Sequence, residues 1–210
     1  MTPITSTALI VVIDDNEDDA VLLRERLSEI EWLNAQIVHV ENAQNAVEVV
    51  RRTNPAVIFL DYKLGATTGL DLLRRFRTEN LLHPVIMLTG AGDEYLAAET
   101  AHAGAYAYLI KDDMNTPRLP ETLRRVLDQA DADAPRRAEQ ASTLARLETL
   151  TPREREVLGE LVAGLTNKQI GIKLHRSVET IKVHRAHIMS KLQADSTADL
   201  VRRVMNAKLG

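Results

Sequence analysis

The chain has 210 residues, of which 45% are hydrophobic and 27% charged, and its formal net charge is −4. It contains no cysteine, which excludes disulfides, thiolate nucleophiles and cysteine-ligated metals. No apolar run approaches the roughly 18 residues of a membrane-spanning helix, and the N-terminus lacks the basic and apolar regions of a signal peptide. We therefore expect a cytoplasmic protein that does not bind membranes.

The charge is unevenly distributed along the chain. Residues 1–128 carry 12 Lys and Arg against 20 Asp and Glu, residues 129–148 carry 3 against 4, and residues 149–210 carry 11 against 6. An acidic first part and a basic last part indicate two functions, and the basic part suggests nucleic-acid binding. We expect a domain at 1–128, a linker at 129–148 and a second domain at 149–210.

The first part alternates short apolar runs, rich in β-branched residues, with segments of helical periodicity. Such runs predict buried strands, and the amphipathic segments between them predict helices. The expected strands are 8–13, 36–40, 56–60, 84–89 and 105–110, and the expected helices are about 17–30, 43–53, 69–79, 94–103 and 117–130. Five such units predict a doubly wound α/β domain with a five-stranded parallel sheet, whose ligand crevice lies at the carboxyl ends of the strands.

The composition changes after this domain. Residues 131–148 are rich in alanine and charge and include Pro135, so they are either a flexible tether or a helix that follows the proline. The last part reads as four short helices. The pairs Thr151 with Glu154 and Thr166 with Gln169 are capping boxes that begin the first two. Two residues separate the second and third helices, as a helix-turn-helix requires.

Five acids follow the first strand within six positions, namely Asp14, Asp15, Glu17, Asp18 and Asp19. Two carboxylates at the end of a buried strand repel each other, which is unfavourable unless a cation lies between their oxygens. Carboxylate oxygens suit Mg²⁺. The last three fall in the first turn of the expected helix, where acids interact favourably with the helix dipole. We therefore expect the first two to bind metal and the other three to begin the helix.

Other strand ends carry complementary groups. Asp61 ends the third strand, Thr89 ends the fourth, and Lys111 follows the fifth. Because the carboxyl ends of parallel strands meet at one edge of the sheet, these groups should lie beside the acidic pair. A metal, a carboxylate nucleophile, a hydroxyl and an ammonium together suit phosphoryl transfer.

The ordered set DD (14–15), LD (60–61), LTG (88–90) and YLIKD (108–112) resembles the receiver domain of two-component response regulators. The resemblance implies a flavodoxin-like fold, Mg²⁺ as cofactor, a sensor histidine kinase as partner and no enzymatic activity beyond self-phosphorylation. It implies Asp61 as phosphoacceptor, metal ligation by Asp14, Asp15, Asp61 and the backbone carbonyl of Lys63, and phosphoryl-contact and switch roles for Thr89, Lys111 and Tyr108. Many receivers have prolines where this sequence has Gly65 and Asp112, and the first departure suggests a more mobile loop.

Residues 150–201 resemble the LuxR-type DNA-binding domain of NarL/FixJ-family regulators, and the stretches GLTNKQI and VETIKVHRAHIMSKL are particularly FixJ-like. The resemblance implies binding of double-stranded DNA as a homodimer through the last helix, with RNA polymerase as a further candidate partner. It implies base contacts from Lys182, Val183 and Ala186, and phosphate contacts from Asn167, Lys168, Thr180, Arg185 and His187. His175, His184 and His187 have no accompanying acids or cysteines, so they do not predict a metal site.

The sequence thus predicts a transcriptional regulator that is activated when a kinase phosphorylates Asp61. A phosphohydrolase of the haloacid dehalogenase type would need a second aspartate where Lys63 stands. A LuxR-type regulator that senses a small molecule would need a ligand-binding first domain, against which the 3% aromatic content speaks. An adaptor that works without phosphorylation is a further alternative, and its DNA binding would not respond to a phosphoryl donor.

Overall fold

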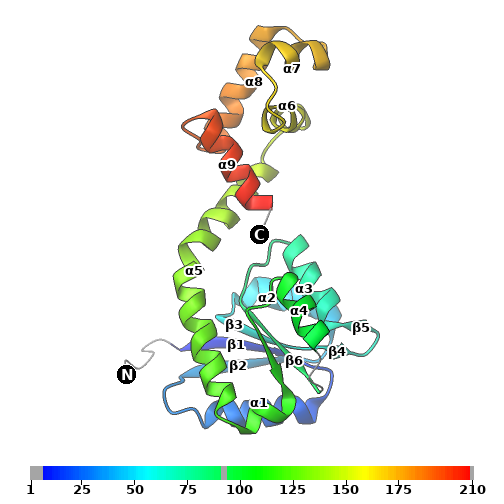
Figure 1. Cartoon of the computed structure of the whole chain (residues 1–210), viewed down its shortest axis with the longest axis vertical. Coiled ribbons are helices and arrows are strands. Elements are labelled where there is room, and N and C mark those ends of the chain that lie inside the picture. Colours follow the sequence, from blue (N-terminus) through cyan, green and yellow to red (C-terminus); the bar gives the residue numbers. More distant parts are fainter. Residues whose placement is uncertain (1–6, 91–93, 209–210) are drawn as a thin grey trace. The chain divides into compact units, whose positions relative to one another are not determined.

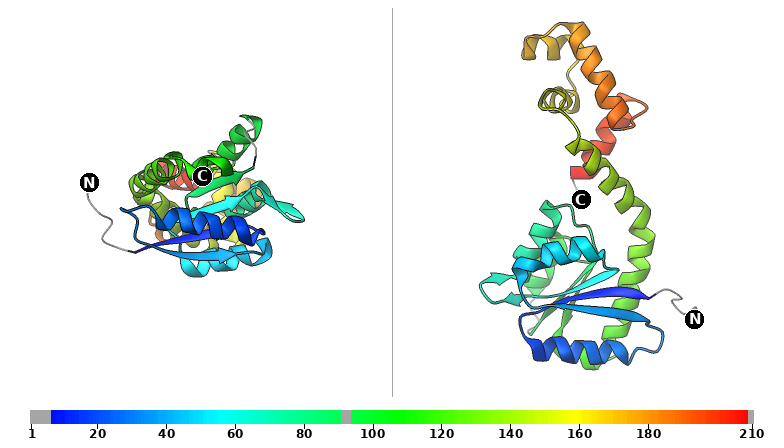
Figure 2. Two further views of the ribbon diagram at one scale, coloured as in Figure 1. Left: turned by 90° about the horizontal axis from the view of Figure 1, so that it is seen from below. Right: turned by 180° about the vertical axis from the view of Figure 1, so that it is seen from behind.

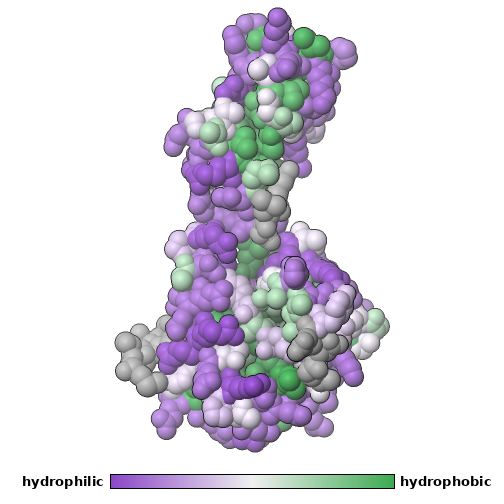
Figure 3. All heavy atoms as spheres, viewed as in Figure 1, coloured by the Kyte–Doolittle hydropathy of each residue, from purple (hydrophilic) through white to green (hydrophobic). Residues whose placement is uncertain are grey.

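The structure is a computed structural model that describes residues 7–90 and 94–208. The chain forms two compact units, Met1–Ala134 and Pro135–Gly210. Among the described residues, no helix is long and apolar enough to cross a membrane. On the face seen in Figure 3, each unit is mainly hydrophilic and carries smaller apolar areas among the hydrophilic ones.

The first unit is a parallel sheet of five strands with helices on both faces (Figures 1 and 2). The strand order is β2-β1-β3-β6-β7, which confirms the predicted doubly wound fold. The strands are β1 (Ala8–Ile13), β2 (Ala35–Val40), β3 (Val57–Asp61), β6 (Val85–Thr89) and β7 (Ala107–Ile110). The helices are α1 (Glu17–Ser28), α2 (Ala43–Thr53), α3 (Gly69–Thr78), α4 (Glu94–His102) and the first part of α5 (Arg118–Glu148).

Two elements near the carboxyl edge of the sheet were not predicted. A hairpin of β4 (Lys63–Leu64) and β5 (Thr67–Thr68) follows β3, and a 3-10 helix (Lys111–Asn115) follows β7. Each is too short to produce a periodic hydrophobic pattern, so hydrophobic periodicity does not reveal it.

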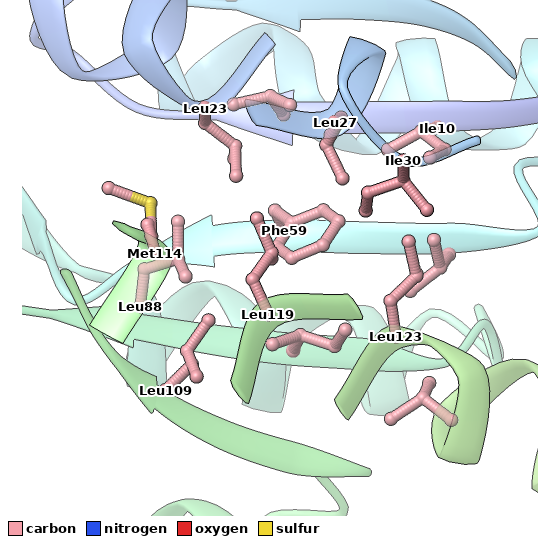
Figure 4. Close-up of a cluster of buried hydrophobic side chains, with 14 of the residues drawn as sticks. Ile10, Leu23, Leu27, Ile30, Phe59, Leu88, Leu109, Met114, Leu119 and Leu123 are labelled. Carbon is pink, nitrogen blue, oxygen red and sulfur yellow. The ribbon is translucent and has the colours of Figure 1, made fainter. Parts of the chain in front are cut away.

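The sheet separates two apolar layers. On one face, Phe59 of β3 packs with Leu27 of α1 and Leu123 of α5 (Figure 4). On the other face, Ile58 and Leu60 pack with residues of α2 and α3. Because successive strand residues point to opposite faces, β3 is buried along its whole length, and its last residue, Asp61, reaches the edge of the sheet.

The backbone comes close to itself where β3 leads into the hairpin. The N–H of Gly69 donates to the carbonyl of Tyr62 at 2.7 Å. A Cβ at position 69 would overlap the backbone carbonyl oxygen of Asp61 and approach the sulfur of Met87 to 3.2 Å. Glycine is therefore required here because a side chain would push the end of β3 out of place.

Gly69→Ala should lower the free energy of unfolding of the first unit by about 1–3 kcal/mol, the usual cost of overpacking. The lone tryptophan of the chain, Trp32, lies in this unit, so the fluorescence change in urea measures its unfolding. Gly90→Ala is the matched control, since a Cβ there meets nothing within 4 Å. Equal stability of the two variants would contradict the expected overlap.

Helix α5 is longer than the helix predicted at about 117–130. It runs from Arg118 to Glu148 through the expected linker, and residues on both sides of Pro135 are helical. Alanine and long charged side chains favour helix in this stretch. The proline removes one backbone donor where the chain divides into its two units.

The second unit contains the end of α5 and four short helices, as predicted. These are α6 (Pro152–Val162), α7 (Asn167–Leu174), α8 (Val178–Lys191) and α9 (Thr197–Lys208). Both predicted capping boxes are present, at Thr151 with Glu154 and at Thr166 with Gln169. Helix α7 ends in a left-handed residue, His175 (φ 52°), so that the chain turns at once into α8.

Candidate functional site

Three carboxylates meet at the carboxyl edge of the sheet in the first unit. The register pairs Ile13 of β1 with Leu60 of β3, so Asp14 and Asp61, which follow them, lie side by side. Asp14 and Asp61 are buried, with 1% and 4% exposure, whereas Asp15 is exposed. One oxygen from each of the three lies within 4.8 Å of the others. Hard oxygen ligands at this spacing suit Mg²⁺.

The ammonium of Lys111 lies among these acids. Its Nζ is 2.9 Å from Asp14 Oδ2, 2.9 Å from Asp61 Oδ1 and 2.7 Å from Asp19 Oδ2. Burial disfavours the charged form of Lys111, but hydrogen bonds to Asp19, Asp14 and Asp61 outweigh it and raise its pKa above that of an ordinary lysine. The ammonium therefore stays charged and offsets the repulsion between the carboxylates.

Asp61 is an unusual carboxylate. Burial raises its pKa, the hydrogen bond from Lys111 opposes this, and the nearby charge of Asp14 raises it further. The backbone N–H of Lys63 donates to Asp61 Oδ2 at 2.9 Å, which orients the carboxylate. Asp61 is therefore held in one orientation, and its charged form is made less stable by its surroundings.

The other predicted receiver residues lie on neighbouring strands. Thr89 ends β6 with 5% exposure, and the register of β3 with β6 pairs Asp61 with Leu88, next to it. Tyr108 lies on β7 opposite Met87, is half-buried and packs against the apolar layer shared with α2 and α3. Both residues thus lie on strands that end at the same edge of the sheet as Asp61.

Two further contacts at this edge were not predicted. His39 of β2 donates from Nε2 to the backbone carbonyl of Asp14 at 2.8 Å, and the side chain of Asp14 accepts the N–H of Asn16 at 2.9 Å. His39 follows from no motif, because only the pairing of β1 with β2 places it there. These bonds hold Asp14 at both its backbone and its carboxylate.

The group of three acids after Asn16 occupies the first turn of α1, as expected, with Asn16 as the N-cap. Their position in the first turn fully explains the presence of Glu17 and Asp18, which are exposed. Asp19 has a further role, because its Oδ2 also contacts Lys111. The residue spacing gives no signal for this contact, because it joins the first turn of α1, which begins at Glu17, to the residue that follows β7.

In the second unit, α8 has one buried and one exposed face. Ile181 and Ile188 are fully buried in the core of this unit. The three predicted base contacts, Lys182, Val183 and Ala186, are all exposed, and Val183 keeps 53% of its surface. The apolar side of α8 therefore packs into the unit, and the three residues on its other side are accessible to solvent.

The predicted phosphate contacts fall into two groups. Lys168 and His187 are exposed, whereas Thr180 is half-buried near the start of α8. Arg185 donates to Asn167 Oδ1 at 3.3 Å and to Thr197 Oγ1, so it connects α8 to the starts of α7 and α9. The structure thus brings Arg185 and Asn167 together.

Glu154 was predicted only as part of a capping box, but its buried carboxylate also forms an ion pair. Its side chain is 5% exposed, and its Oε2 lies 2.7 Å from Lys191 Nζ. The hydrogen bond from Lys191, followed by that from the Thr151 backbone, lowers the pKa of Glu154 to about 2. This pair joins the start of α6 to the end of α8.

Comparisons with known proteins identify a domain in each of the two units. Residues 10–124 match the family model described as the response regulator receiver domain, and residues 148–204 match that of the bacterial regulatory proteins of the luxR family. The chain belongs to the two-component response regulators with a LuxR-type DNA-binding domain.

Individual relatives of this regulator match it over at least 90% of its length. The transcriptional regulatory protein FixJ of Bradyrhizobium diazoefficiens is 31% identical, over 90% of this chain and 93% of its own. FixJ of Rhizobium meliloti is 32% identical, over 95% and 96%. The crystal structure of full-length FixJ from B. japonicum matches with a TM-score of 0.53 and 30% identity, covering 98% of this chain and all of that one. The regulator thus shares both domains, in the same order, with these relatives.

Proposed function

We propose that a sensor histidine kinase phosphorylates Asp61 and that the phosphorylated regulator binds double-stranded DNA as a homodimer. The observation that carries this proposal is the buried Asp61 carboxylate, which contacts Lys111 and lies beside Asp14 and Asp15 at the carboxyl edge of the sheet. We assign residues 1–128 to the receiver, 129–148 to the linker and 149–210 to the DNA-binding domain. The regulator would act in the cytoplasm, where it would also contact RNA polymerase.

In the proposed reaction, an oxygen of Asp61 attacks the phosphorus of a kinase phosphohistidine. The new O–P bond forms as the P–N bond breaks, and the histidine leaves. Mg²⁺, when bound by Asp14, Asp15, Asp61 and the Lys63 carbonyl, would neutralise charge on the phosphoryl oxygens. Lys111 would donate to one of these oxygens in place of Asp61 Oδ1. The protein contributes positioning and charge, and no further catalysis is required.

The signal would leave the site through Thr89 and Tyr108. The hydroxyl of Thr89 would donate to a phosphoryl oxygen, and Tyr108 would turn inward into the space that Thr89 vacates. Such a change biases the receiver between two conformations instead of creating a new one. Dimerisation through α9 on a two-fold symmetric DNA site would follow.

On DNA, we propose that α8 enters the major groove. Its exposed residues Lys182, Val183 and Ala186 would contact bases, the last two through apolar contacts such as thymine methyl groups. Phosphate contacts would come from Asn167, Lys168, Thr180, Arg185 and His187. The bonds of Arg185 with Asn167 and Thr197 use two of the five guanidinium donors, so a phosphate contact remains compatible with them.

The decisive experiment is selection of bound DNA from a random pool with and without a phosphoryl donor and Mg²⁺. We expect a two-fold symmetric site and an affinity about tenfold higher after phosphorylation, corresponding to a coupling of about 1.4 kcal/mol. If DNA binding by the wild-type protein is unchanged by the donor although Asp61 is phosphorylated, the adaptor that works without phosphorylation is correct instead.

Lys182→Ala and Lys168→Ala should weaken DNA binding in different ways. Loss of a base contact at position 182 should cost about 1–3 kcal/mol on the selected site and relax specificity at one base pair. Loss of a phosphate contact at position 168 should weaken binding to all sequences equally and reduce the salt dependence by about one ion. Fluorescence anisotropy on specific and scrambled duplexes over a salt series measures both. An equal loss on the two duplexes with Lys182→Ala would contradict its assignment.

A further inference from the structure

The three carboxylates around Lys111 are not equivalent. Asp14 and Asp61 belong to the group that we assign to the metal, and their side chains are 2% and 6% exposed. Asp19 lies outside that group, on the first turn of α1, and its side chain is 32% exposed. It makes the shortest of the three contacts, 2.7 Å, and it also accepts a hydrogen bond from Asn16 Nδ2 at 3.2 Å.

Phosphorylation places different demands on these contacts. An ammonium has three donors, and here the three carboxylates match them one to one. When Asp61 becomes an acyl phosphate, Lys111 must exchange Asp61 Oδ1 for a phosphoryl oxygen, and Asp14 must share its charge with the metal. Asp19 takes part in neither change, so it is the contact that can persist throughout the reaction.

We propose that Asp19 is a positioning residue that holds the Lys111 ammonium beside Asp61 while the phosphoryl group is transferred. This inference rests on the proposed phosphorylation of Asp61. Without the contact to Asp19, the long side chain of Lys111 would sample other rotamers. In those rotamers its ammonium would no longer donate a charge-assisted hydrogen bond to the phosphoryl group. The outermost of the three acids would thus set the position of the ammonium that neutralises the phosphoryl group.

The negative charge of Asp19 also has an opposing effect, because it repels the incoming phosphoryl group. That repulsion acts across the Lys111 ammonium and at a partly exposed position, where solvent screens charges strongly. The anchoring effect is a direct hydrogen bond between opposite charges at 2.7 Å. We therefore expect anchoring to be the larger effect, so that removing the charge slows phosphorylation.

The test is a double-mutant cycle in the full-length protein. The initial rate of phosphorylation is measured with acetyl phosphate and Mg²⁺ in wild type, Asp19→Asn, Lys111→Met and the double variant. Asparagine keeps the shape and one acceptor oxygen but removes the charge. We expect Asp19→Asn to lower the rate about tenfold, as loss of a supporting contact around a reactive site commonly does. In the Lys111→Met background the same change should alter the rate less than about twofold, because the group it positions is absent.

Asp18→Asn is the matched control. It removes the same charge from the same helical turn, is exposed, and should leave the rate within about twofold of wild type. Trp32 fluorescence during urea unfolding shows whether each variant is folded, and Asp19→Ser replaces Asp19→Asn if that variant is not. An unchanged or faster rate in Asp19→Asn, or an equal loss with and without Lys111, overturns the proposal. Failure of wild type to become phosphorylated would instead overturn the proposed function.

Discussion

Asp61→Asn should abolish phosphorylation by acetyl phosphate and Mg²⁺, with incorporation falling at least about 100-fold to background, since an amide is not a nucleophile for this step. Intact-mass spectrometry measures the added phosphoryl group directly. The increase in DNA affinity on adding the donor should disappear with it. Asp112→Asn is the control, because it removes an exposed acid next to Lys111 and should be phosphorylated like wild type.

Asp61→Asn should also make the first unit more stable. The pKa of Asp61 is raised by burial, so the charged carboxylate is less favourable in the folded protein than in the unfolded chain. The contribution of Asp61 to stability is then greatest below the ordinary pKa of 3.8 and is lost as pH rises through the raised pKa of the folded protein. Asparagine has no charge to desolvate. At pH 7 the melting temperature of the Asp61→Asn variant, followed by Trp32 fluorescence, should therefore exceed that of wild type. Phosphorylation of a well-folded Asp61→Asn variant would contradict the assigned phosphoacceptor.

Lys191→Met should destabilise the second unit by about 2–3 kcal/mol. The substitution leaves Glu154 charged and 5% exposed without its ammonium partner, and removing one member of a buried pair commonly costs about 3–5 kcal/mol. We expect slightly less because Lys191 itself is 35% exposed and Thr151 still donates to Glu154. Far-UV circular dichroism of the full chain measures the loss. Since the lone tryptophan lies in the first unit, the transition that does not change Trp32 fluorescence belongs to the second.

The destabilisation should depend on pH in a defined direction. The pKa of Glu154 is lowered from an ordinary 4.5 to about 2, so its pairing stabilises the fold above about pH 4.5 and is lost as pH falls toward 2. The difference between wild type and Lys191→Met should shrink over that interval. Lys173→Met is the control, because Lys173 is 58% exposed and pairs with Glu160 at the surface, where a pair is worth about 0–1 kcal/mol. Equal effects of both substitutions would contradict a special role for Glu154.

Most of the strands and helices follow from local patterns. The predicted strands at 8–13 and 84–89 match β1 and β6 to within one residue at each end, and the predicted helix at 43–53 matches α2. Periodicity works here because a strand buried on both faces must be apolar throughout and a covering helix must be apolar on one side. At α5 the change in composition left a flexible tether and a helix open, and the chain is helical through this stretch, Pro135 included.

The receiver site could be predicted largely because of its topology. Once a parallel sheet is recognised, residues at the ends of different strands must meet at one edge, so Asp14, Asp61, Thr89 and Lys111 could be grouped from their positions alone. The contact of Lys111 with Asp14 spans 97 residues and is nevertheless foreseeable on this basis. The roles proposed for these residues come from the resemblance to receiver domains, and the phosphorylation rates of the Asp61 and Asp19 variants test them.

What the sequence by itself determined is which residues form the sheet and its covering helices, which strand ends carry acids, and which face of α8 is polar. These features depend on local spacing and on the burial of apolar side chains. Only the tertiary structure decided that Asp19 contacts Lys111, that His39 bonds to Asp14 and that Glu154 pairs with Lys191. Each of these contacts depends on ångström-scale packing of separate elements, because a hydrogen bond requires a distance and a direction that residue spacing along the chain does not specify.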